Sequence, residues 1–320
     1  MSLTKNQYDS IKQEYDRRQM ERHRIIEERK KEIYEKIPGY RDIDNEIASV
    51  SIRAGIEALS SDTKPNLTET LEELKRKKDL LLTGAGYSIN YLNPPYKCSY
   101  CKDTGYIGSE ACHCFKQAVL DSTYRDPNAK TLLKDENFNT LSHDYHSGED
   151  LTKFINAEKV ARNFVANFEF EKGNILFKGN AGTGKSFLSN CIANELIQRG
   201  YSVIYSSSVS LFERISSYAF SKDKSVMDNP LKDIYNCDLL VIDDLGSELT
   251  NQFVCAELFS IVNERHLRNK STVISTNLDF SEISARYTER TFSRIYSYYH
   301  TCDLSGTDVR IYKKRIENRK

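Results

Sequence analysis

The octapeptide "GNAGTGKS" at residues 179–186 combines three glycines, a lysine and a serine at a spacing that suits one kind of chemistry. Glycines let backbone N–H groups converge on the oxygens of a phosphate chain, and a helix that begins directly afterwards adds a favourable dipole. The lysine can reach the β- and γ-phosphates, and the serine hydroxyl is a ligand for Mg²⁺. The pattern therefore predicts a site for MgATP. The predicted contacts are Gly179, Asn180, Ala181, Gly182, Thr183, Gly184, Lys185, Ser186 and Phe187.

Two further stretches end apolar runs on polar side chains. In "LLVIDDLG" (239–246) the pair Asp243 and Asp244 follows four apolar residues. Asp243 is predicted to hold Mg²⁺ together with Ser186, and Asp244 to polarise the attacking water, although its reach is shorter than that of a glutamate. A helix cap is the alternative use of two such acids. Asn277, which ends "VISTN", is predicted to orient a water or contact the γ-phosphate; a turn-forming asparagine is the alternative.

Four of the eight cysteines lie within 17 residues, at Cys98, Cys101, Cys112 and Cys114. Four thiolates can close a tetrahedral Zn²⁺ site with no open position, which is a structural rather than a catalytic arrangement. The single residue between the second pair leaves His113 as a substitute ligand, and an iron–sulfur cluster is a further alternative. The other cysteines stand in apolar contexts and are expected to be core residues.

The elements that must position these residues can be read from the periodicity. Strands are predicted at 174–179, 201–207, 237–244, 271–277 and 301–305, with helical patterns between them. Apolar strands that alternate with amphipathic helices predict an α/β fold with a parallel five-stranded sheet covered on both faces.

The first part of the chain has a different character. Residues 3–36, 41–59 and 66–83 are predicted to be helices, and the first is dense in charge and ends at Pro38 and Gly39. So narrow an apolar stripe suits either a small module that docks on a partner or a solvated helical hairpin. The expected domains are a helical region (1–93), a cysteine module (94–120), a linker (121–150) and the α/β domain (151–320).

Composition limits the remaining choices. Basic and acidic residues are equal in number, 46 each, so any contact with a polyanion must use a local patch or an assembly of several chains. There is no run of 18 apolar residues and no apolar core of a secretory signal. The chain is therefore expected to be a soluble cytoplasmic protein with no membrane contact.

The order of the motifs resembles a family. "GNAGTGKS", "IDDLG" and "STN", followed by "ERTFSRI" (289–295) and "GTDVRIYKK" (306–314), is similar to AAA+ ATPases, and most of all to bacterial replicative-helicase loaders of the DnaC/DnaI type. The resemblance implies that Arg294 enters the ATP site of the next subunit in trans, with Arg290 as a competitor for that role. It also implies that Arg310 contacts the γ-phosphate in cis and that residues 1–93 bind a hexameric DnaB-type helicase. A surface salt bridge is the alternative for each arginine.

The resemblance implies that the chain is an ATPase that self-assembles with ATP and controls release of the helicase onto single-stranded DNA. The alternatives are an IstB-like transposition helper and a nucleotide-gated interaction protein with negligible hydrolysis. DNA contacts are least defined. They are sought among aromatic and basic residues after the second strand, and in the basic tail 310–320, although core packing explains most of the aromatics. The residues are Phe212, Tyr218, Phe220, Lys222 and Lys224.

Overall fold

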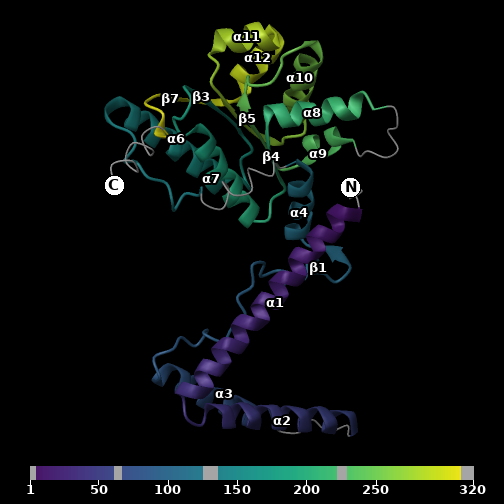
Figure 1. Ribbon diagram of the computed structural model, residues 1–320, viewed down its shortest axis with the longest axis vertical. Helices are drawn as coiled ribbons and strands as arrows, with labels where there is room; N and C mark the ends of the chain where they lie inside the picture. Colours follow the sequence, from purple (N-terminus) through teal and green to yellow (C-terminus); the bar gives the residue numbers. More distant parts are fainter. Residues whose placement is uncertain (1–4, 61–66, 125–135, 222–228, 311–320) are drawn as a thin grey trace. The chain divides into compact units, whose positions relative to one another are not determined.

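The structure is a computed structural model that describes residues 5–60, 67–124, 136–221 and 229–310 of the chain (Figure 1). The chain divides into two compact units, one formed by Lys12–Ile107 and the other by Gly108–Lys320 together with Met1–Ile11. The domain boundaries expected after residues 93, 120 and 150 are not the same as this division, and they stay predictions.

The smaller unit is built from helices. They are α1 (Lys5–Lys36), which belongs to this unit from Lys12 onward, α2 (Tyr40–Ser60) and α3 (Leu67–Gly84), close to the three predicted helices. Gly39 has a left-handed φ of +79° and turns the chain between α1 and α2. A small core of Ile33, Ile37, Tyr40 and Leu82 closes the junction, because these apolar residues recur on one face of otherwise charged helices.

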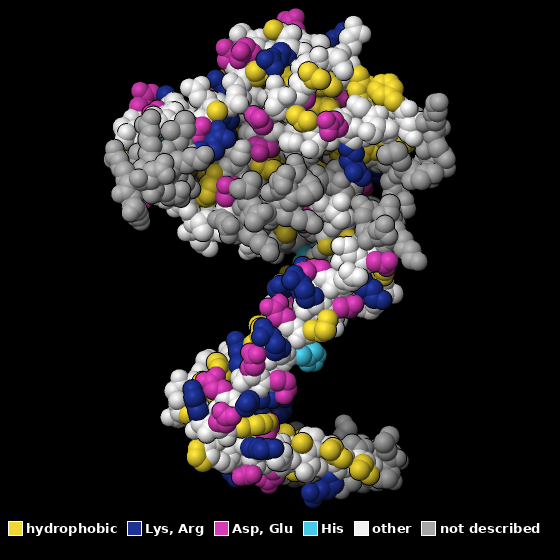
Figure 2. All heavy atoms as spheres, viewed as in Figure 1, with side chains coloured by type: hydrophobic (Ala, Val, Ile, Leu, Met, Phe, Trp, Pro, Cys, Tyr) yellow, Lys and Arg dark blue, Asp and Glu magenta, His cyan; other side chains and the backbone are white. Residues whose placement is uncertain are grey.

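Hydrophobic side chains also lie on the surface of this unit. Ile52 and Ile56 are one helical turn apart on α2 and are 65% and 62% exposed, and Figure 2 shows hydrophobic side chains along this helix. Leu80 of α3 is 71% exposed. Among the described helices, none combines the length and apolarity that a bilayer span requires.

The larger unit contains a parallel sheet of five strands in the order β4-β5-β6-β3-β7. The strands are β3 (Asn174–Gly179), β4 (Val203–Ser207), β5 (Leu239–Leu245), β6 (Ser271–Thr276) and β7 (His300–Leu304). Each lies within about two residues of its predicted position. The strand β3, which leads into the glycine-rich loop, pairs with both β6 and β7 and is therefore an interior strand. The predicted α/β fold with a parallel five-stranded sheet is confirmed.

Both faces of the sheet are covered by helices (Figure 1). Alternate strand residues face opposite sides: Ile175 and Phe177 pack with α6 and α7, and Leu176 packs on the other face. This is why the strands read as continuous apolar runs. The helices are α6 (Gly148–Asn167), α7 (Lys185–Gln198), α8 (Ser208–Ala219), α9 (Pro230–Asn236), α10 (Gln252–Leu267), α11 (Phe280–Tyr287) and α12 (Glu289–Tyr298).

The edge strand β4 is covered by α4 (His113–Tyr124), which follows the cysteine-rich segment. The buried side chain of Gln117 donates to the carbonyl of Val203 at 2.8 Å and accepts from its N–H at 2.9 Å, as a neighbouring strand would. Unpaired strand edges are prone to unwanted pairing, so this amide protects the edge. In sequence, the two-residue strands β1 (Tyr106–Ile107) and β2 (Glu110–Ala111) come just before α4.

Candidate nucleotide-binding site

The glycine-rich loop connects β3 to α7, as predicted. Gly182 and Gly184 adopt left-handed φ values of +74° and +98°, and α7 begins at Lys185. A Cβ atom at Gly182 would lie 2.1 Å from the carboxyl group of Asp308, and one at Gly184 would lie 2.7 Å from the ring of Phe154. Only glycine fits these two positions, because the backbone is left-handed and the neighbouring side chains leave no room for a Cβ. The loop is therefore packed directly against Asp308 and Phe154.

The ammonium group of Lys185 lies at the centre of the site. It donates hydrogen bonds of 2.6 Å to the carbonyls of Gly179 and Asn180 and to the side-chain oxygen of Asn277. Burial lowers the pKa of Lys185, and the nearby carboxylates of Asp244 and Asp243 oppose that shift. A phosphate oxygen is a stronger partner for this ammonium group than a neutral carbonyl, because the hydrogen bond is then charge-assisted on both sides.

The residues proposed to hold Mg²⁺ are in contact. The Ser186 hydroxyl donates to Oδ1 of Asp243 at 2.9 Å, and Ser275 of β6 donates to the same oxygen. Tyr205 of β4 donates to Oδ2 of Asp243 at 2.8 Å. Mg²⁺ prefers a few protein oxygens and keeps several waters, and this carboxylate and hydroxyl fit that donor set. Sequence reasoning missed Ser275 and Tyr205, which orient the carboxylate.

Asp244 is the second-last residue of β5. Its φ is +54°, in the left-handed region, at the point where the pairing of β5 with β6 becomes irregular. Its N–H donates to Ser275 at 2.8 Å, and its carboxylate accepts from the Asn277 amide at 3.1 Å. Hydroxyls of Ser208 and Ser247 hold its carbonyl at 2.9 and 2.8 Å. These contacts hold the carboxylate beside Asn277, and its role as the base for the attacking water stays a prediction.

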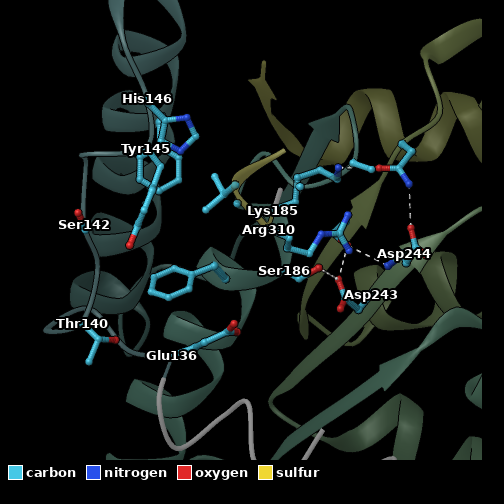
Figure 3. A pocket seen from close by; sticks show the side chains of 18 residues that line it. Glu136, Thr140, Ser142, Tyr145, His146, Lys185, Ser186, Asp243, Asp244 and Arg310 are labelled. Atoms are coloured by element: carbon cyan, nitrogen blue, oxygen red, sulfur yellow. Dashed lines mark hydrogen bonds between the residues drawn. The ribbon is translucent and has the colours of Figure 1, made fainter. Parts of the chain in front are cut away.

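The last described residues pack on the glycine-rich loop. The N–H of Val309 donates to the carbonyl of Gly182 at 3.0 Å, and Arg310 lines the cavity beside Lys185 and Asp244 (Figure 3). Arg310 forms hydrogen bonds of 3.1 and 2.9 Å with Asp308, which raises its pKa. The side chain therefore lines the same cavity as Lys185, and its contact with a γ-phosphate in cis stays a prediction.

Arg294 lies elsewhere. It is on α12, donates to the hydroxyl of Tyr298 at 2.6 Å, and does not belong to the described residues that line this cavity. Arg290, its competitor, is exposed at the start of the same helix. A side chain that acts in trans must lie outside its own site, and the trans role of Arg294 stays a prediction.

The cavity has a volume of about 450 Å³, within the usual range for small-molecule sites. One wall comes from the segment 136–147, which the sequence analysis treats as a linker. Asn194 of α7 donates to the carbonyl of Glu136 at 2.7 Å, and His146 stacks on Phe154 with ring centres 4.3 Å apart. The wall consists of Glu136, Thr140, Ser142, Tyr145 and His146 (Figure 3), and Phe154 of α6 also lines the cavity. The aromatic pair in "HDYHSG" is a weak sequence signal for it.

This wall is attached to α6 through a buried carboxylate. Oε2 of Glu158 lies 2.6 Å from Nε2 of His143, and Oε1 accepts from Arg162 at 2.8 Å. Arg162 also donates to the carbonyl of Phe138 at 3.2 Å. Burial raises the pKa of Glu158, but the hydrogen bonds from His143 and Arg162 outweigh it, and the net pKa is lowered.

The four clustered cysteines come together as predicted. Their sulfurs lie within 4.8 Å of one another, and His113 is not part of this group. Sulfurs at the corners of a tetrahedron with Zn–S bonds of about 2.3 Å are about 3.8 Å apart, so the donor set fits one zinc ion. The N–H of Gly105 lies 3.3 Å from Sγ of Cys101, and buried Asp103 accepts from the N–H of Cys98 at 2.8 Å. Such contacts orient metal ligands.

The structure shows where some of the residues that were predicted to contact DNA lie. Phe212 is 2% exposed and belongs to the core, as its helical spacing indicates, whereas Phe220 is 72% exposed and packs on Phe253. Lys222, Lys224 and residues 311–320 lie outside the described residues. Cys191, Cys237 and Cys302 are buried as expected, and Cys255 is partly exposed.

The fold and the site together define a P-loop nucleotide-binding protein. Residues 132–315, more than half of the chain, match the family described as IstB-like ATP binding protein. The chain belongs to this family.

Individual relatives match parts of the chain. It is 30% identical over 141 residues to "Replicative helicase loader DnaC" of Escherichia coli (strain K12), which is 44% of this chain and 57% of that protein. The chain thus spans little more than half the length of that relative. It is 26% identical over 250 residues to "Phage-like element PBSX protein XkdC" of Bacillus subtilis (strain 168), covering 73% of this chain and 90% of that protein.

Solved structures include the DnaC helicase loader, with a TM-score of 0.47 and 22% identity over 54% of this chain and 99% of that one. DnaI aligns with a TM-score of 0.43 and 23% identity over 55% of this chain and 92% of that one.

Proposed function

We propose that this chain is an ATP-dependent loader that delivers a ring-shaped replicative helicase onto single-stranded DNA. The observation that carries the proposal is the direct contact of Lys185 with Asn277 and of Asn277 with Asp244. This arrangement can register the γ-phosphate, and it occurs in a chain whose curated relatives include replicative helicase loaders. Binding and hydrolysis of MgATP would then switch an assembly between states that hold and release the helicase.

The parts of the chain have distinct proposed roles. Ser186 and Asp243 hold Mg²⁺, Asp244 polarises the attacking water, and Arg310 contacts the γ-phosphate in cis. Arg294 enters the site of the next subunit, where a guanidinium contributes roughly 10³ to 10⁵ in rate. The cysteine cluster holds a structural zinc, and the helical region 1–93 binds the helicase. The exposed Ile52 and Ile56 of α2 support an interaction role for that region. A cytoplasmic location belongs to the same proposal.

Capture of the helicase tests the proposal. The full chain is immobilised and incubated with the replicative helicase of the same host, with ATP, with ADP and without nucleotide. A second assay measures transfer of the helicase to circular single-stranded DNA by its unwinding of an annealed strand. We expect capture by the unaltered chain and by Lys185→Ala, but transfer by the unaltered chain alone, because only transfer requires the nucleotide switch.

The alternative is an IstB-like transposition helper, because the matched family is described as IstB-like ATP binding protein. The two functions differ in partner. A chain that captures no helicase, yet stimulates a transposase from the same genome in an ATP-dependent way, would contradict the loader proposal. Capture with no transfer under any nucleotide condition would instead limit the chain to an interaction role.

A further inference from the structure

The turn that follows Asp244 is joined to the helix pair that carries Arg294 by a buried carboxylate. Glu248 is 8% exposed; its Oε2 accepts from the N–H of Gly246 at 3.0 Å, and its Oε1 accepts from the hydroxyl of Tyr287. Tyr287 is the last residue of α11 and is fully buried. One carboxylate therefore connects the chain two residues after Asp244 with the residue that ends α11.

Two more contacts reinforce the connection. Arg286 donates to the carbonyl of Gly246 at 2.8 Å, so both backbone groups of Gly246 are held. Gly246 has a φ of +107°, and a Cβ there would lie 2.7 Å from the side chain of Leu278. Leu278 directly follows Asn277. The turn after Asp244 is thus in contact with Leu278, the neighbour of Asn277, on one side and with the end of α11 on the other.

The connection continues into α12. Thr288, between Tyr287 and α12, has φ +79° and ψ 150° and is the N-cap of α12. A β-branched residue in the left-handed region is an outlier that persists only where the surroundings impose it, and such residues gather at functional sites. The carbonyl of Thr288 accepts from Phe292 at 3.1 Å in the first turn of α12. Arg294 lies in the next turn, so the direction of α12 determines where its guanidinium points.

We propose that Glu248 and Tyr287 act as positioning residues that set the start of α12, and with it the reach of Arg294, according to the state of the turn after Asp244. The inference rests on the proposed trans role of Arg294. The ATP site of one subunit would then govern the arginine which that subunit offers to its neighbour. Burial explains why a single hydroxyl has such an effect: losing one partner leaves the Glu248 carboxylate buried and underpaired.

Hydrolysis in mixed assemblies provides the test. Asp244→Asn removes the proposed base and keeps Arg294, so this chain can only donate an arginine; asparagine tolerates the left-handed turn. Arg294→Ala keeps its own site and donates nothing. Each variant alone is expected to be inactive, and an equimolar mixture with ATP and single-stranded DNA recovers hydrolysis where an intact site meets an intact arginine.

Tyr287→Phe is then placed in one chain of the mixture at a time. In the arginine donor it is expected to lower the recovered rate by about tenfold to a hundredfold, the effect of misplacing a reacting group by about 1 Å. In the chain that supplies the site, the loss is expected to be clearly smaller. Glu248→Gln should show the same asymmetry, because Gly246 and Tyr287 donate to different carboxylate oxygens and the amide NH2 group that replaces one of them cannot accept a hydrogen bond.

Tyr299→Phe is the matched control. It removes a hydroxyl from a tyrosine of the same buried cluster, immediately after α12 and outside the Glu248 contacts. It should produce equal effects in donor and acceptor. Equal losses for Tyr287→Phe in both chains, or no loss, overturn the inference. If the mixture of Asp244→Asn and Arg294→Ala recovers no hydrolysis before Tyr287 is changed, both the inference and the trans role of Arg294 are overturned. Helicase capture still tests the loader proposal separately.

Discussion

The ammonium group of Lys185 donates a 2.6 Å hydrogen bond to the side-chain oxygen of Asn277, although the two residues are 92 positions apart. The amide of Asn277 also donates to Asp244 at 3.1 Å. The contact joins the phosphate-binding loop to the end of β6. An incoming γ-phosphate must compete with Asn277 for the lysine, so phosphate binding and the orientation of the asparagine are coupled.

Asn277→Ala should therefore separate binding from hydrolysis. We expect hydrolysis to fall by about 10²-fold or more, since one oriented donor contributes about that much to transition-state stabilisation. Nucleotide affinity should change far less, because Lys185 and the loop remain. The measurements are single-turnover hydrolysis and fluorescent-nucleotide titration. A loss of affinity that matches the loss of rate would contradict a sensor role.

Gly184→Ala should abolish nucleotide binding, because the new Cβ would lie 2.7 Å from Phe154 and the residue would have to keep a φ of +98°. Gly173→Ala is the matched control: it stands just before β3, and nothing lies within 4 Å of the Cβ it would add. Calorimetric titration with MgATP compares the two variants. Binding by Gly184→Ala at the unaltered affinity would show that the loop tolerates a side chain there.

The cysteine cluster should bind one zinc ion per chain and stabilise its surroundings. Cys101→Ser is expected to lose the metal and to melt at a lower temperature, since structural zinc contributes on the order of 10 kcal/mol to the folding of a small module. Cys255→Ser serves as the control, because Cys255 lies outside the cluster. Elemental analysis and thermal melts measure both effects. Full zinc content in Cys101→Ser would point to His113 as a ligand.

The attachment of the 136–147 wall should weaken in acid. The pKa of Glu158 is lowered in the folded chain, so its contribution to stability is fully present above its ordinary value of 4.5 and is lost as pH falls through the folded pKa. Glu158→Gln should flatten this part of the profile. Urea unfolding between pH 3 and pH 7 measures the free energy of unfolding of the unaltered chain and of Glu158→Gln. Identical profiles would mean that the contacts of Glu158 with His143 and Arg162 contribute nothing to stability.

The contiguous parts of the site could be read from the sequence alone. The loop 179–187 is recognisable because phosphate binding needs glycines, a lysine and a hydroxyl at consecutive positions of one turn. The five strands are recognisable because a sheet covered on both faces needs unbroken apolar runs. Asp243, Asp244 and Asn277 follow from the same reasoning, since the ends of parallel strands meet at one edge.

The remaining parts depend on contacts between residues far apart in the chain, and only the tertiary structure decided them. The segment 136–147 has the composition of a linker, and it becomes a wall because Glu158 and Asn194 hold it against α6 and α7. Gln117 pairs with the edge of β4 across 86 residues, and Glu248 meets Tyr287 across 39. A single polar residue belongs to no periodic pattern from which its partner could be predicted. Its role appears only when the order of the strands brings that partner within hydrogen-bond distance.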